Sequence, residues 1–230
     1  MGTIWDYSPI LRHGLLMTVE LTVLGILGTV VVSFVVGLAR LSSHAVLRVP
    51  AYVFVEVFRG TSLVVQLFWI FYALPFAGFQ FDPVPAAVLV LALNEGSYGA
   101  EIVRGTIATR PIGQTEACIA LGLSPTQRLW RVLIPQSIPR MIPAFGNVMV
   151  DLMKATSLVS LVTVSDLTFG ALSIRQAVGG QTLALLGLLL VTYFVFSIVL
   201  SAVARLLEWR LALDRPVPRR RRVAIPEVVA

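Results

Sequence analysis

Residues 181–209 read QTLALLGLLLVTYFVFSIVLSAVARLLEW, an apolar run that carries no charged side chain before Arg205. A helix rises about 1.5 Å per residue, so roughly 20 residues cross the hydrocarbon core of a bilayer. This run therefore predicts a membrane-spanning helix. Four further apolar runs precede it, and the five predicted spans are approximately residues 15–39, 51–74, 84–107, 137–164 and 181–209.

The composition agrees with an integral membrane protein. Of the 230 residues, 57% are apolar and only 13% are charged. Soluble globular chains average about 45–50% and about 25%, respectively. Because helices satisfy their backbone amides within one segment, the predicted fold class is all-α, a polytopic membrane protein with five transmembrane helices.

Basic residues are distributed unequally along the chain. Arginines cluster at or after the first, third and fifth predicted spans, whereas the other connections contain only Arg12 and Arg175. Lys and Arg accumulate on the cytoplasmic side of membranes. The extracytoplasmic N-terminus is therefore predicted as residues 1–14, and the basic cytoplasmic tail as residues 212–230. We expect the net charge of +6 to serve contact with membrane lipid and not with nucleic acid.

The connection between the third and fourth spans, residues 108–136, is longer than a bundle needs. Gly122 can adopt the left-handed conformation that ends a helix. Residues 124–127 (Ser-Pro-Thr-Gln) then have the form of a capping box with proline at the first helical position, and Pro135 predicts an end or a kink. We expect two short helices joined by a sharp corner, which form an interaction surface.

Polar side chains within the spans mark a candidate translocation pathway, because such groups are costly in hydrocarbon. The fourth span has three of them at helical spacing on one face, and the second and third spans contribute others. The candidate pathway residues are Arg59, Gln66, Glu101, Asn147, Asp151 and Lys154.

A pathway of this kind would suit a zwitterion. Glu101 or Asp151 would attract an ammonium or guanidinium group, and Lys154 or Arg59 would receive a carboxylate. The alternative is that the charges neutralise one another within the chain, Asp151 with Lys154 and Arg59 with Glu56.

No catalytic residue or metal site is expected. The chain has one cysteine and two histidines, His13 and His44, which lie on different segments. Neither a Cys/His metal site nor a nucleophile–base pair follows from so few groups.

Five short motifs occur in the order and spacing found in the permeases of polar amino acid ABC importers. Residues 116–118 (Glu-Ala-Cys), Gly122 and residues 132–135 (Val-Leu-Ile-Pro) resemble the EAA signature of that family. The signature reads Glu-Ala-Ala, three residues, Gly, nine residues, Ile, any residue, Leu-Pro. The other four motifs are Phe58–Leu63 with Gln66, Tyr98–Gly105, Pro111–Gln114 and Lys154–Leu158.

The resemblance implies a type I ABC importer permease fold over residues 15–211, in the bacterial cytoplasmic (inner) membrane. The EAA loop would form a coupling helix that docks on a cytoplasmic ABC ATPase dimer. The implied ATPase-coupling residues are Glu116, Ala117, Cys118, Gly122 and Pro135. A second permease subunit, the same or a sister chain, and an extracytoplasmic solute-binding protein would complete the complex.

The chain itself is expected to bind no cofactor. Its only lysine, Lys154, is not part of a Gly-Lys-Ser/Thr phosphate loop, so the partner ATPase would use the ATP. The runs 55–69 and 165–169 also resemble ectoine and hydroxyectoine permeases, an alternative to a standard amino acid as substrate. A third possibility, an ATPase-independent channel or membrane scaffold, would leave the EAA loop unexplained.

Overall fold

The computed structural model describes residues 7–177 and 181–211, and within these ranges the chain forms helices and no strands. Four helical stretches are long and apolar enough to cross a membrane, and a bent pair of helices provides a fifth span. The predicted fold of five membrane-spanning segments is therefore confirmed. The principal helices are α1 (Ser8–Arg40), α2 (Ala45–Gly60), α3 (Leu63–Phe68), α4 (Pro83–Ala108), α7 (Ile134–Ala155) and α9 (Thr182–Leu211).

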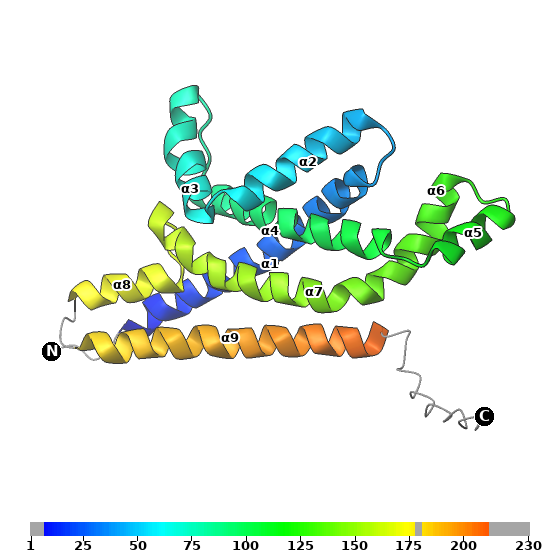
Figure 1. Ribbon diagram of the computed structural model, residues 1–230. Coiled ribbons are helices and arrows are strands. Elements are labelled where there is room, and N and C mark those ends of the chain that lie inside the picture. The colour runs from blue at the N-terminus through cyan, green and yellow to red at the C-terminus, as the bar shows by residue number, and fades with distance from the viewer. Residues whose placement is uncertain (1–6, 178–180, 212–230) are drawn as a thin grey trace, which may run out of the picture.

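The long helices run side by side, as Figure 1 shows, and α1 starts at the end of the bundle opposite to the end of α9. Helix α1 begins at Ser8, so the second half of the predicted N-terminal segment belongs to the first helix. The fourth predicted span, 137–164, overlaps a longer helical stretch, Pro125–Val162, which begins earlier and ends before the left-handed Thr163. The first six residues and the predicted tail, 212–230, lie outside the described residues.

The helix continues through Pro135 and does not end there. A short stretch of π-helix, η4 (Leu129–Leu133), directly precedes α7, and Pro135 lies in the first turn of α7. Proline lacks an amide proton and its ring crowds the carbonyl one turn earlier. A π turn is rare and occurs mostly as a single turn inside an α-helix; here it stands where proline would otherwise break the hydrogen-bond ladder.

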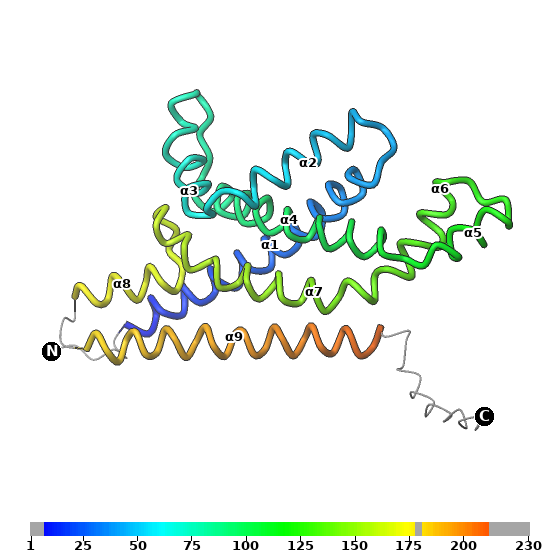
Figure 2. Tube along the Cα trace, viewed as in Figure 1, coloured from blue at the N-terminus to red at the C-terminus, as the bar shows by residue number. Residues whose placement is uncertain are grey.

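The second predicted span is not one straight helix. Helices α2 and α3 meet at 105°, and Figure 2 shows α3 turning away from α2. Thr61 and Ser62 at the break have extended backbones. The carbonyl of Phe58, which loses its helical partner, accepts hydrogen bonds from Gln66 Nε2 at 3.0 Å and Asn94 Nδ2 at 3.1 Å. These two amides satisfy a backbone group that the bilayer would leave unpaired.

Helix α8 (Leu167–Ala177) was not predicted, because eleven residues are too few to cross a bilayer. Asp166 caps it, since its Oδ1 accepts the amide of Phe169 at 2.9 Å. The Leu167 amide donates to Thr18 Oγ1 of α1 at 3.1 Å. Helix α8 therefore lies against the first turns of α1, at the end of the bundle where α9 begins.

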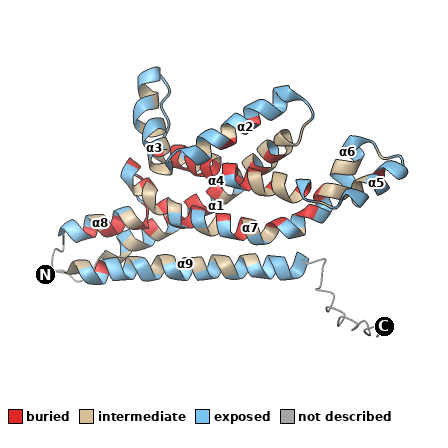
Figure 3. Ribbon diagram, in the orientation of Figure 1, coloured by how far each residue is buried: buried red, intermediate tan, exposed pale blue. Residues whose placement is uncertain are grey.

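The core is formed around the contact between α1 and α4. Small residues allow these helices to approach closely: a Cβ added to Gly28 would lie 2.6 Å from Ala92 Cβ, and one added to Gly37 would lie 2.8 Å from the Ala100 carbonyl oxygen. Ser33 Oγ of α1 also donates to the Gly96 carbonyl at 3.3 Å. Figure 3 shows buried residues concentrated on α1, α4 and α7, whereas α9 is mostly exposed.

We predict that Gly99→Leu destabilises the fold and Gly105→Leu does not, although both glycines lie on α4. A Cβ at Gly99 would lie 2.8 Å from Ser33 Cβ, whereas one at Gly105 meets no neighbouring atom within 4 Å. Forcing extra volume into a packed contact costs about 1–3 kcal/mol. The thermal unfolding midpoint in mild detergent measures the difference, and equal midpoints would contradict close α1–α4 packing.

Candidate functional site

The connection between α4 and α7 forms a rigid corner. Helix α5 (Ile112–Ala120) is followed by Gly122, whose φ of +70° is left-handed. The Gly122 amide donates to the Ile119 carbonyl at 2.9 Å, and the Leu123 amide donates to the Cys118 carbonyl at 3.0 Å. These two bonds define a Schellman motif, which satisfies the last carbonyls of the helix.

The corner leads into the short helix α6 (Pro125–Arg128), which has the predicted capping box. The Gln127 amide donates to Ser124 Oγ at 3.3 Å, and the Ser124 amide donates to Gln127 Oε1 at 3.0 Å. The prediction of two short helices joined at a sharp turn is therefore confirmed. Both helices lie at the end of the bundle opposite to α8 (Figure 1).

Arg110 connects this corner to α7, a role that its sequence context did not suggest. Its Nη1 donates to Gln114 Oε1 of α5 at 3.0 Å and to Gln136 Oε1 of α7 at 2.6 Å. Its Nε donates to Ser137 Oγ at 2.9 Å. Burial and the nearby Arg140 lower the pKa of Arg110 from its ordinary value. The guanidinium still holds α5 against the start of the fourth span.

The outer surface of the corner is apolar. Ile112 and Leu121 are 76% and 77% exposed, and Ile119 and Trp130 are more than half exposed. Large apolar side chains exposed this far are candidates for contact with a partner protein. We call this surface the corner patch, and its residues are Ile112, Ile119, Leu121 and Trp130.

The predicted coupling residues differ in their exposure. Glu116 and Ala117 are exposed on α5, next to the corner patch, and Pro135 is exposed on α7. Cys118 is only 4% exposed, so its thiol faces the inside of the loop and not the surface. Gly122 provides the turn between the helices.

The predicted polar face of α7 is exposed in the single chain. Asn147, Asp151 and Lys154 all lie on it. Lys154 Nζ is 3.5 Å from Asp151 Oδ1, and the two side chains are 57% and 65% exposed. The two charges therefore pair, as the alternative interpretation expects. Charged groups so exposed on a membrane-spanning helix do not face lipid, because hydrocarbon does not solvate them.

A cleft of about 470 Å³ lies beside this face, at the break between α2 and α3. Its lining residues come from the break, α4 and α7: Thr61, Ser62, Leu63, Asn94, Glu95, Tyr98, Val148 and Asp151. We call it the polar cleft. It brings residues of three spans together, which the sequence did not allow us to predict.

Glu95 is the group in the polar cleft that sequence reasoning missed. It is only 9% exposed, and no hydrogen bond or ion pair holds its carboxyl within the described part of the chain. A buried carboxyl without a partner is costly, so such a group calls for a counterpart. Glu95 is a single acid in a glycine-rich stretch and belongs to no motif. Its charge within a predicted membrane span was the one feature of the sequence that marked it as a candidate.

The remaining predicted pathway residues have other contacts. Gln66 bonds to the broken helix end and to Asn94 Nδ2 at 3.0 Å. The Arg59 guanidinium lies 5.1 Å from the centre of the Tyr98 ring, at the edge of the polar cleft. Glu101 forms ion pairs with Arg40 and Arg104, and it does not line the polar cleft.

A helical membrane bundle with a rigid, apolar corner at one end and a polar cleft between its spans has the build of a transport permease. The comparisons with known proteins agree. The profile of the family described as "Binding-protein-dependent transport system inner membrane component" matches residues 29–213.

Curated relatives give the same result. The chain is 44% identical over 209 residues to the probable amino-acid ABC transporter permease y4tF of Sinorhizobium fredii, covering 88% of this chain and 87% of the relative. It is 37% identical to the glutamine transport permease GlnP of Escherichia coli K12, covering 92% and 97%.

A solved structure is also similar. It is described as an amino acid ABC transporter with histidines, and it matches with a TM-score of 0.83 and 33% identity over 91% of this chain and 100% of the other. The chain belongs to the family of inner-membrane components of binding-protein-dependent transport systems, and it is a permease subunit of an ABC importer.

We predict that Gly122→Ala loosens the corner and that Gly113→Ala does not. A Cβ at either glycine meets no neighbouring atom within 4 Å, so the two variants differ only in backbone conformation. A left-handed φ costs an L-residue about 1–2 kcal/mol. This cost corresponds to about a 5–30-fold more frequent opening of the hydrogen bond between the Leu123 amide and the Cys118 carbonyl. Hydrogen exchange at the Leu123 amide should rise by that factor in Gly122→Ala alone. Equal exchange rates in both variants would mean that the corner does not require the left-handed conformation at Gly122.

Proposed function

We propose that this permease couples ATP hydrolysis by a separate ABC ATPase dimer to the import of a polar amino acid. The observation that carries the proposal is the corner patch, an apolar surface with Glu116 beside it at the far end of the bundle. Lipid does not account for such a surface if α5 and α6 project beyond the bilayer. A protein partner accounts for both the apolar side chains and the carboxylate.

The exposed part of the loop suggests how the ATPase binds. Leu121 and Ile112 offer apolar contacts, and Ala117 leaves room for close approach. The Glu116 carboxylate lies at the edge of these contacts, where an arginine of the partner would form a charge-assisted pair. The chain supplies no phosphate loop of its own, so the energy for transport comes from the partner.

A movement of the ATPase would reach the membrane through Arg110. The guanidinium joins Gln114 on α5 to Gln136 and Ser137 on α7. Helix α7 runs from this junction to the face with Asp151. Displacement of α5 would therefore move the polar face of α7 as one body, which is a rigid-body route to alternating access.

The corner then belongs in the cytoplasm, as the distribution of arginines predicts. Because α1 starts at the opposite end of the bundle, the N-terminus would lie outside and the C-terminus inside. A solute-binding protein would deliver its cargo at the end where α8 lies. The name of the family supports this partner.

A second permease would cover the polar face of α7. Asp151 and Lys154 are more than half exposed in the single chain, and a bilayer would leave them without solvation. A second subunit placed against this face would enclose a polar path between the two chains. The same chain or a sister chain would serve equally well.

The polar cleft suggests the class of substrate. Glu95 is buried with no hydrogen bond or ion pair to any described residue, and Asp151 lies in the same cleft, so the site favours a positively charged group such as the ammonium of an amino acid. Named relatives carry glutamine, L-cystine or octopine, which are all amino acids or their derivatives. Ectoine or hydroxyectoine stays an alternative prediction, which none of these names supports.

A channel or scaffold that works without an ATPase remains the alternative from another class. Such a protein would need neither the corner patch nor the hydrogen bonds from Arg110 to α7. Transport that continues without ATP hydrolysis would favour it over the proposal.

We predict that Glu116→Lys abolishes coupling. The reversed charge would repel the arginine expected on the ATPase, and loss of one charged contact costs about 2–5 kcal/mol. Uptake by proteoliposomes that contain the whole importer should therefore fall at least about thirtyfold. Thr126→Lys, which also introduces a lysine, on the exposed α6, serves as the control. If Glu116→Lys transports and assembles like the wild type, α5 is not the coupling helix.

We predict that Glu95→Gln lowers the maximal uptake rate by about tenfold or more, without loss of assembly. The amide keeps the size of the side chain but removes the charge that would balance an ammonium group, and such a contact is worth about 1.5–3 kcal/mol. Glu20→Gln, which neutralises an exposed acid on α1 outside the polar cleft, is the matched control. Unchanged uptake by Glu95→Gln would remove Glu95 from the pathway.

A further inference from the structure

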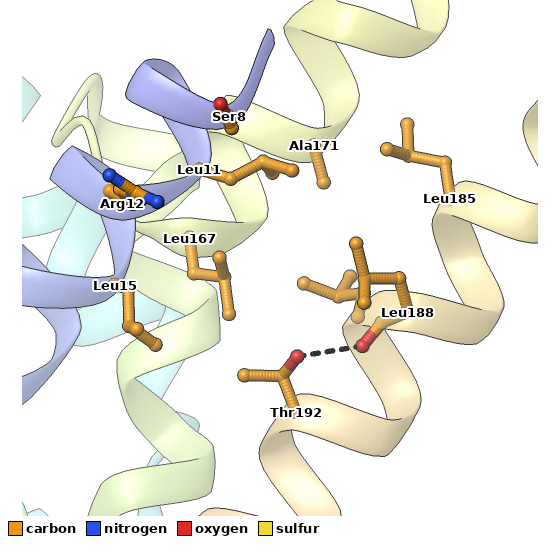
Figure 4. A pocket seen from close by; sticks show the side chains of 10 residues that line it. Ser8, Leu11, Arg12, Leu15, Leu167, Ala171, Leu185, Leu188 and Thr192 are labelled. Carbon is orange, nitrogen blue, oxygen red and sulfur yellow. Dashed lines mark hydrogen bonds between the residues drawn. The ribbon is translucent and has the colours of Figure 1, made fainter. Parts of the chain in front are cut away.

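A second cavity, which shares no lining residue with the polar cleft, lies between α1, α8 and α9 and has a volume of about 450 Å³. Six of its ten lining residues are leucines: Leu11 and Leu15 come from α1, Leu167 from α8, and Leu185, Leu188 and Leu189 from α9. Figure 4 shows the side chains of α1 and α9 on opposite sides of the gap. We call this cavity the leucine groove, and the proposed transport mechanism does not use it.

One cation lies at the leucine groove. Arg12 of α1 lines it together with Ser8, and its side chain is exposed. Within residues 7–177 and 181–211, no hydrogen bond or ion pair engages this guanidinium. The one other polar lining residue, Thr192, uses its hydroxyl to bond the Leu188 carbonyl at 2.8 Å. The groove therefore presents one available cation beside an apolar wall.

The groove lies near the starts of two membrane-spanning helices. Helix α1 begins at Ser8 and α9 begins at Thr182. Arg12 is about 6 Å along α1 from its start, and Thr192 is about 15 Å along α9, at about 1.5 Å per residue. With the starts of α1 and α9 at one face of the bilayer, the guanidinium would lie at headgroup level and the leucines would extend toward the hydrocarbon, at the end of the bundle opposite the corner patch.

The surroundings of the groove favour lipid over protein. Helix α9 exposes Leu183, Leu190 and Phe194 by 89%, 69% and 62%, which is the surface of a helix that contacts hydrocarbon. A second permease is expected instead at the polar face of α7. An apolar groove that opens at a lipid-facing helix, with a cation at headgroup level, complements an amphiphile with a negatively charged head.

We propose that the leucine groove is a binding site for an anionic phospholipid. One acyl chain lies along Leu11, Leu15 and Leu188, and the headgroup phosphate accepts hydrogen bonds from the Arg12 guanidinium and the Ser8 hydroxyl. The lipid fills the space between α8 and α9. It thereby holds the short helix α8 in place at the membrane face where the solute would enter.

The first test measures headgroup selectivity. The whole importer is purified in mild detergent and incubated with equal amounts of phosphatidylglycerol and phosphatidylcholine, and native mass spectrometry counts the lipids retained. The wild type should retain phosphatidylglycerol preferentially. Arg12→Gln should reduce that preference about fivefold, the effect of one arginine at a membrane surface.

Arg175→Gln is the matched control, because Arg175 is exposed on α8 near the same membrane face but does not line the groove. It should keep the selectivity of the wild type. An equal loss in both variants would mean that general surface charge attracts the lipid, and this result would overturn the site. Unchanged selectivity in Arg12→Gln would overturn the role of Arg12.

The second test fills the groove. Leu188 and Leu186 are 39% and 40% exposed, but only Leu188 lines the groove, so Leu188→Trp and Leu186→Trp form a matched pair. Only Leu188→Trp should lose the retained phospholipid, and both variants should assemble. Retention in Leu188→Trp, or a bound mass that corresponds to a free fatty acid, would overturn the proposal.

Discussion

The hydrocarbon core of a bilayer contains no water, so every backbone amide and carbonyl within it must find a hydrogen-bond partner in the protein. This constraint determines the rest of the structure. It explains why the described residues form helices, and why the one break within a span is closely repaired. Where α2 ends, the carbonyl of Phe58 is bonded by side chains of Gln66 and Asn94, from two different helices. The break is thereby stable at membrane depth, and it opens the space that becomes the polar cleft.

The loop helices and the membrane-spanning helices are stabilised by different interactions. The short helices α5 and α6 rely on a Schellman motif and a capping box, which depend only on residues close in sequence. Within the membrane, α1 and α4 rely on small residues that allow close contact. Arg110 joins these regions, because its guanidinium bonds residues of both α5 and α7. In the proposed mechanism, these hydrogen bonds would carry a movement of α5 to α7.

The periodicity and hydropathy of the chain were sufficient to predict the membrane class, five spans and the corner between α5 and α6. These features depend on neighbours close in sequence, such as Ser124 with Gln127. Helix α8 escaped prediction because its eleven residues do not span a bilayer. The sharp turn at Thr61 also escaped, since its stabilising partner Asn94 lies far away along the chain.

Hydropathy and short motifs are local properties, so the amino-acid sequence was enough to predict the membrane spans, the turn in the loop and the family resemblance. Which polar groups meet became known only from the folded chain. It paired Glu101 with Arg40 and Arg104, and placed the buried Glu95 in the cleft with Asp151. The physical reason is that the distance between side chains on different helices depends on packing, which the spacing of residues within one helix does not encode.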